Sequence, residues 1–344
     1  MASRPLKRID DSRLSMAEIV GEESLAGQRM QAGAILDLID IIGGRIANRH
    51  AASAVTTLSF DRVDLVYPIL HLDLIQLDGN ILAVGNSSML IAVQGYRKDT
   101  YTRRFMPIQR AYMTFVAVDE QRRPNRDIPG LSYRTPEEDG LRNEAREQQL
   151  RSAAWVRMQQ ENEALGGLRA ADVEDDTNRG KSEYVSPAGS EITVRRMFMP
   201  KHVNQIGTIF GGDILHWMDK VAIYTARHFT RNRSMVTIAM NRIFFKQPIF
   251  PTDTVEMVAR VVYVRTYTLE VEIRVRIERS SGEQVESHSG YFTVFNYDES
   301  GFKRPILTGL RLADEDQDGL RRYLQARERH RFWNEREKAR GARD

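Results

Sequence analysis

Apolar side chains recur every three to four positions in two segments of the chain, one in each half. In the second half the spacing runs from Gly212 to about His228, and the positions that follow it are Ile214, Leu215, Met218, Ala222, Thr225 and Phe229. Residues spaced in this way share one face of an α-helix. The segment from Gly33 to His50 follows the same pattern. Because little of either surface is polar, the pattern predicts two long, buried helices.

Other segments have the period of β-strands. Residues 269–277 alternate strictly between apolar and charged or polar side chains, and residues 254–264 and 235–245 are rich in β-branched types. Such runs are typical of antiparallel strands with one covered face. The first half repeats this order of one helix followed by several strands. We therefore expect an α+β fold in which each half wraps a strongly bent sheet around its own helix.

The two halves also share sequence. Residues 33–40, GAILDLID, return as GDILHWMD at residues 212–219, so that Asp40 and Asp219 are 179 positions apart. Residues 114–119 and 293–298 match at the same spacing, and a further match pairs Arg62 and Pro68 with Arg242 and Pro248. A period this long indicates a duplicated domain and not a solenoid repeat.

The expected organisation is two domains with a polar insertion between them. We assign residues 17–135 to the first domain and 188–312 to the second, since 344 residues suffice for two compact units. Residues 136–187 are rich in Glu, Arg and Gln and are expected to form a linker with a helix near residues 144–165. Residues 313–344 are expected to form a charged helix with a solvated face.

Composition narrows the possible chemistry. The chain has no cysteine, which rules out thiolate nucleophiles and favours a reducing compartment, so we expect a cytoplasmic protein. A net charge of +3 among 97 charged residues gives no reason to expect nucleic acid as a partner. No apolar run reaches the length of a membrane span. We expect neither a cofactor nor a metal, because His50, His216 and His228 have no partners at catalytic or metal-binding spacing.

Candidate chemistry lies where the second helix begins. The segment from Asn204 to Gly212, NQIGTIFGG, runs directly into this helix. Its last two glycines, Gly211 and Gly212, leave backbone N–H groups accessible, as in an oxyanion hole. Two turns further on, Asp219 is flanked on its helix face by apolar residues, and Asp40 in the first half also lacks a cationic neighbour. Burying a carboxylate without a partner is costly unless function retains it.

The pattern N-x-x-G-x-x-x-G-G followed by aspartate resembles the acyl-CoA thioesterase branch of the hotdog-fold superfamily, and the two copies resemble its tandem-hotdog acyl-CoA hydrolases. The resemblance covers roughly residues 24–129 and 195–305. It implies that the long helices are central helices of two hotdog domains, which pair as an intramolecular pseudo-dimer. It also implies active sites at the seam between the domains, hydrolysis of fatty acyl-CoA to free acid and CoA, and assembly into a homo-oligomer, possibly a trimer.

The two seams are expected to be unequal. When Asp40 is aligned with Asp219, Leu25 stands opposite Asn204 and Ala32 opposite Gly211. Only one seam therefore has a complete set, in which Asp40 of the first domain meets the glycine loop of the second. In that set we expect Asp40 to act as general base or nucleophile, the Gly211 N–H to polarise the thioester carbonyl and Asn204 to orient water or carbonyl.

The resemblance also places contacts to the CoA moiety in the turns between two strands of each half. The candidate residues are Gly85, Asn86, Ser87, Ser88, Arg265 and Thr266. The guanidinium of Arg265 is well shaped for a phosphate, although an ordinary polar turn accounts for the same residues.

Two alternatives to a thioesterase stay open. The first is a hotdog hydratase acting on enoyl-CoA, which would need an Asp and a His a few residues apart at the catalytic loop; no such pair accompanies residues 204–212. The second is a non-catalytic protein that binds or senses acyl-CoA. A sensor would normally carry a DNA-binding module, for which the first twenty residues are too short.

Overall fold

Two long helices are the centres of the two halves. The computed structural model describes residues 4–26, 29–65, 67–98 and 104–341. Helix α1 spans Ala32–Ala51 and helix α4 spans Gly211–Thr230, within two residues of the predicted limits at either end. Side chains such as Ile39 and Met218 are fully buried, which confirms the expectation of buried helices.

Each helix packs against an antiparallel sheet of its own half. The strands of the first half that build its sheet are β2 (Leu14–Ile19), β5 (Ala54–Phe60), β7 (Leu74–Val84), β8 (Ser88–Lys98) and β9 (Phe105–Val118). Those of the second half are β12 (Ile192–Met197), β13 (Met235–Met240), β15 (Thr254–Val264), β16 (Thr268–Glu278) and β17 (Gln284–Asn296). The domain boundaries stay a prediction, with β2 reaching back before residue 17.

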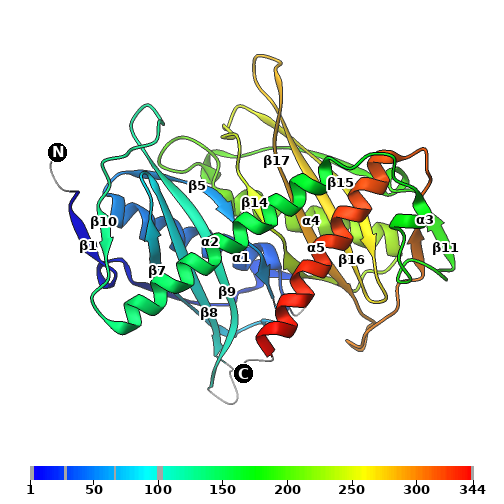
Figure 1. Cartoon of the computed structure of the whole chain (residues 1–344), viewed down its shortest axis with the longest axis horizontal. Helices are drawn as coiled ribbons and strands as arrows, with labels where there is room; N and C mark the ends of the chain where they lie inside the picture. Colours follow the sequence, from blue (N-terminus) through cyan, green and yellow to red (C-terminus); the bar gives the residue numbers. More distant parts are fainter. Residues whose placement is uncertain (1–3, 27–28, 66, 99–103, 342–344) are drawn as a thin grey trace.

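Three pairs of short strands lie outside the two large sheets. They are β1 (Leu6–Arg8) with β10 (Gly130–Ser132), β3 (Leu25–Ala26) with β4 (Arg29–Met30), and β11 (Glu183–Val185) with β18 (Thr308–Leu310). The fold is the expected pair of hotdog domains, in which α1 and α4 contact each other along the seam (Figure 1).

Each large sheet contains one short strand from the other half of the chain. Strand β6 (Val63–Asp64) comes from the first half but pairs with β13, so the second sheet has the order β12-β15-β16-β17-β13-β6. Strand β14 (Ile243–Phe244) comes from the second half but pairs with β5, which gives the order β14-β5-β9-β8-β7-β2. Residues 235–245, whose composition indicated strand, are therefore divided between β13 and β14. The chain leaves one sheet after Met240 and enters the other at Ile243.

Two further helices lie on the outer faces of the sheets. Helix α2 (Pro136–Glu163) runs across the first sheet and helix α5 (Gln317–Gly341) across the second, and the two helices contact each other (Figure 1). A third, α3 (Ala170–Val173), contacts α5. Helix α2 begins eight residues before its predicted start. Thr135 caps its N-terminus and forms a capping box with Glu138, and Pro136 occupies the first helical position.

The face of α5 that meets the sheet is not solvated, in contrast to the expectation from its charge. The side chain of Arg329 is 1% exposed and pairs with Glu270 of β16 at 2.5 Å, while its guanidinium lies 3.6 Å from the ring centroid of Tyr291. Arg322 likewise pairs with the buried Glu272 of the same strand. The charged side chains of α5 thus hold this helix to the second sheet.

No helix in the described part of the chain is long and apolar enough to cross a membrane.

Candidate active site

Glycines allow α1 and α4 to approach closely at their amino-terminal turns. A Cβ atom added to Gly212 would lie 2.9 Å from the backbone Cα of Asp37, and one added to Gly33 would lie 2.6 Å from the Cα of His216. Both distances are shorter than real Cβ contacts allow, so only glycine fits. The N-terminus of each helix therefore lies directly on the second turn of the other.

This approach brings Asp40 to the N-terminus of α4. Its Oδ2 atom accepts a hydrogen bond of 2.8 Å from the Gly212 N–H, and its Oδ1 atom accepts one of 2.8 Å from the hydroxyl of Thr57 on β5. The side chain is almost entirely buried, and burial raises its pKa to about 6 despite both hydrogen bonds. At neutral pH the carboxylate is mostly ionised and has a basicity suited to accept a proton.

The second seam repeats this geometry. Asp219 is fully buried; its Oδ2 accepts a hydrogen bond of 2.8 Å from the Gly33 N–H, and its Oδ1 accepts one of 2.5 Å from the Thr237 hydroxyl. Burial raises the pKa of Asp219 as well. Thr57 and Thr237 were not recognised from the sequence, although they are 180 positions apart, the same offset that relates Arg62 to Arg242.

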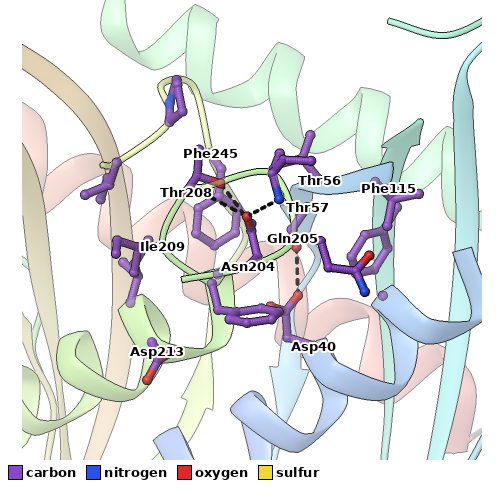
Figure 2. Close-up of a pocket in the computed structure, with 18 of the residues that line it drawn as sticks. Asp40, Thr56, Thr57, Phe115, Asn204, Gln205, Thr208, Ile209, Asp213 and Phe245 are labelled. Carbon is purple, nitrogen blue, oxygen red and sulfur yellow. Dashed lines mark hydrogen bonds between the residues drawn. The ribbon is translucent and has the colours of Figure 1, made fainter. Parts of the chain in front are cut away.

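A cavity of about 650 Å³ opens at the first seam. Of the predicted complete set, Asp40, Asn204 and Gly211 line it, whereas Gly212 does not, and neither does Asp219. Figure 2 shows Asp40 and Asn204 in this cavity. Gly211 is the first residue of α4, and among the described residues its N–H donates no backbone hydrogen bond. The cavity thus combines a carboxylate with an available N–H at a helix N-terminus, where negative charge on a substrate oxygen is stabilised.

Asn204 holds the glycine loop in shape. Its Oδ1 accepts hydrogen bonds of 3.1 Å from the N–H groups of Ile206 and Thr208, and its Nδ2 donates one of 2.8 Å to the Thr208 hydroxyl. These bonds within the loop are visible in Figure 2. One amide hydrogen of Asn204 stays available to the cavity, because an amide nitrogen carries two donors.

Two more carboxylates line the cavity, Asp37 on α1 and Asp213 in the first turn of α4. Asp213 is bonded to His202 at 2.6 Å between Oδ1 and Nδ1. From the sequence, we expected no Asp and His a few residues apart at the loop. His202 and Asp213 are eleven residues apart in sequence and come into contact only in the fold. Four exposed cations line the cavity as well: Arg45, Arg122, Lys201 and Lys246.

The six residues predicted to contact CoA lie elsewhere. Gly85 and Ser88 line a separate cavity of about 240 Å³ between the first sheet and α2, together with the buried pair of Asp61 and Arg242. None of Gly85, Asn86, Ser87, Ser88, Arg265 and Thr266 lines the cavity that contains Asp40. The Arg265 and Thr266 carbonyls accept hydrogen bonds from Lys181 and from the Ile306 N–H, as in an ordinary packed turn.

The histidines named from the sequence are not part of the cavity lining. His50 is buried at the end of α1 and bonds the Pro129 carbonyl at 2.9 Å, while His228 is exposed. Burial lowers the pKa of His216 to about 4, so this side chain is neutral at physiological pH. Within the described residues, no group of His, Cys, Asp and Glu is arranged to hold a metal ion.

Fold and site together define a double-hotdog protein with a buried carboxylate facing a helix N-terminus at the seam of its domains. The sequence profile of the thioesterase superfamily matches residues 29–103 and again residues 206–282. An uncharacterized acyl-CoA thioester hydrolase of Bacillus subtilis, YkhA, is 32% identical over 118 residues, which cover 34% of this chain and 68% of that protein. The chain belongs to the thioesterase superfamily.

Longer relatives align with both halves. Acyl-coenzyme A thioesterase 11 of the mouse is 24% identical over 308 residues, which are 88% of this chain and 50% of that protein. The chain spans about half the length of such mouse relatives. An acyl-CoA hydrolase from Staphylococcus aureus, solved in complex with butyryl coenzyme A, coenzyme A and coenzyme A disulfide, is 27% identical with a TM-score of 0.42, covering 46% of this chain and 98% of that one.

Proposed function

We propose that this protein hydrolyses acyl-CoA thioesters to free acid and CoA at the seam between α1 and α4. The observation that carries the proposal is the cavity in which Asp40, with a pKa of about 6, lies beside the N–H of Gly211, which donates no backbone hydrogen bond within the described part of the chain. The family of the chain supports the same reaction.

In the proposed reaction, the Gly211 N–H donates a hydrogen bond to the thioester carbonyl oxygen. Asp40 accepts a proton from water, whose oxygen forms the new bond to the carbonyl carbon. The resulting oxyanion is stabilised by the helix N-terminus, and the carbon–sulfur bond then breaks to release CoA. Gly212 and Thr57 hold both carboxylate oxygens of Asp40 in place, which favours the role of base over that of nucleophile.

We further propose that the cations at the cavity bind the phosphates of CoA. Arg45, Arg122, Lys201 and Lys246 are exposed and line the cavity, whereas Arg265 does not. Phosphates attract Arg and Lys by charge, and Arg also by its paired donors. The two strand turns do not line this cavity, and their contact with CoA stays a prediction.

The test is release of free thiol from a panel of straight-chain acyl-CoAs of increasing length, with and without a chelator. We expect turnover that the chelator does not change. Tight binding without thiol release would instead support a non-catalytic acyl-CoA-binding protein. Addition of water to an enoyl-CoA without thiol release would support a hydratase, the candidate favoured by the pair of His202 and Asp213. Light scattering would test the expected homo-oligomer.

A further inference from the structure

Asp37 is a second carboxyl group inside the proposed active site, and the reaction described above does not use it. It lies one helical turn before Asp40 on α1, and both side chains line the same cavity. Residues three apart on a helix are neighbours on its surface. Substrate bound against Asp40 is therefore also close to Asp37.

The packing of α4 fixes the place of Asp37 but leaves its carboxyl group free. Gly212 lies so close to Asp37 that an added Cβ would overlap the Oδ1 atom. The Gly212 N–H nevertheless donates to Asp40, and among the described residues no hydrogen bond or ion pair is formed by the Asp37 side chain. A carboxyl group with a free oxygen that faces a cavity can exchange a proton with a ligand there.

The surroundings of Asp37 favour its protonated form. The acidic groups that face it are Glu18 on β2, Asp40 on its own helix and Asp213 on α4; the cations of the cavity, Arg45, Arg122, Lys201 and Lys246, are exposed to solvent. Burial first, and then the charges of Asp213, Asp40 and Glu18, raise the pKa of Asp37 to about 7. Asp40 accepts hydrogen bonds from the Gly212 N–H and the Thr57 hydroxyl, which favour its ionised form, whereas the Asp37 carboxyl group accepts none among the described residues.

We propose that Asp37 is the acid of the reaction and donates its proton to the departing sulfur atom. Asp40 accepts the proton of water as the carbon–oxygen bond forms, and Asp37 gives up its own as the carbon–sulfur bond breaks, so the products are the free acid and the neutral thiol. Transfer of a proton from Asp40 to Asp37 through solvent restores the starting state. This inference rests on the proposed hydrolase activity.

The repeat supplies a matched control. The residue 179 positions after Asp37 is His216, which packs against Gly33 as Asp37 packs against Gly212. His216 does not line the cavity that contains Asp40. Substitution of His216 by Gln therefore disturbs the same kind of helix contact without touching the proposed acid.

The test compares two thioesters of the same fatty acid, one with CoA and one with 4-nitrothiophenol. An alkyl thiolate such as that of CoA is strongly basic and gains from protonation, whereas the aryl thiolate leaves without it. We expect Asp37→Asn to lower kcat/KM for the acyl-CoA by about 10- to 100-fold and for the aryl ester by less than about twofold. Asp37→Glu, which keeps a proton donor, should recover part of the loss, and His216→Gln should change neither value.

Two results would overturn the assignment: equal losses on both esters for a folded Asp37→Asn protein, or no loss on either. The pH profile gives an independent reading. Wild-type kcat/KM for the acyl-CoA should fall as pH rises through about 7, where Asp37 loses its proton, and Asp37→Asn should abolish this fall. A fall that persists in Asp37→Asn also rejects the proposal. If wild-type protein hydrolyses no thioester at all, it is the hydrolase function that fails.

Discussion

Replacement of Asp40 by asparagine should inactivate the protein and at the same time stabilise it. The substitution removes the base but keeps the shape of the side chain. The amide oxygen can accept the hydrogen bond from Gly212 N–H, and the amide nitrogen can donate to the Thr57 hydroxyl, because a hydroxyl both donates and accepts. What disappears is the cost of an ionised group in a buried position.

That cost follows from the pKa of Asp40, which burial raises from 3.8 to about 6. At about 1.4 kcal/mol per pH unit, the difference corresponds to about 3 kcal/mol. Because the pKa is higher in the folded state, the folded protein is favoured while Asp40 is protonated. The cost is absent below about pH 4, grows as pH rises toward 6 and is complete above it.

The assay is denaturant unfolding at pH 4 and pH 8, together with thiol release at pH 8. We expect Asp40→Asn to raise the free energy of unfolding by up to about 3 kcal/mol at pH 8 and by almost nothing at pH 4, while turnover falls by about 10²-fold or more. Asp219→Asn is the matched control: it removes a carboxylate with the same hydrogen bonds, so it should stabilise in the same direction and lower turnover much less.

Either of two results would contradict this reasoning. If Asp40→Asn is less stable than wild type at both pH values, the buried carboxylate is not a cost in the folded state. If Asp219→Asn abolishes turnover while Asp40→Asn leaves it near normal, the working carboxylate is in the second domain.

Three further predictions follow from the site and the fold. Asn204→Ala should lower the turnover number by about 10²-fold. In steady-state kinetics, the double variant Asp40→Asn with Asn204→Ala should have a turnover number only slightly below that of the worse single variant. Lys201→Ala and Arg122→Ala should each raise KM for an acyl-CoA by about two- to fivefold and leave KM for the acyl-pantetheine unchanged; equal effects on both would remove these cations from phosphate binding. After proteolytic cleavage of the linker, the halves should stay together in gel filtration, and separate halves would contradict the exchange of β6 and β14.

The parts of the fold that the sequence predicts are those with local periodicity. The limits of α1 and α4 follow from their apolar spacing, and the repeat aligns Asp40 with Asp219. The exchange of strands has little local signal. Asn241 and Arg242 interrupt the apolar residues of segment 235–245, but only pairing with the other half shows that the chain changes sheets there.

The same distinction separates the predicted and missed parts of the site. Asp40, Asn204 and Gly211 are identified by a motif, and all three line one cavity. The cations do not stand in any motif, since Arg122 and Lys201 belong to different halves and line the same cavity only in the fold. The buried pair of Arg329 and Glu270 is 59 residues apart in sequence, so a charge pattern read along α5 indicates a solvated face where the structure has a contact.

The exchange of strands also has a consequence during synthesis on the ribosome. The edge of β5 at Phe60 is completed by Ile243, which leaves the ribosome 183 residues later. At typical rates of translation this interval is roughly 10 to 40 s. Throughout it, the first sheet has an open edge that another polypeptide can pair with. Correct assembly therefore depends on a kinetic competition, in which the chain's own second half must reach that edge before a neighbouring nascent chain does.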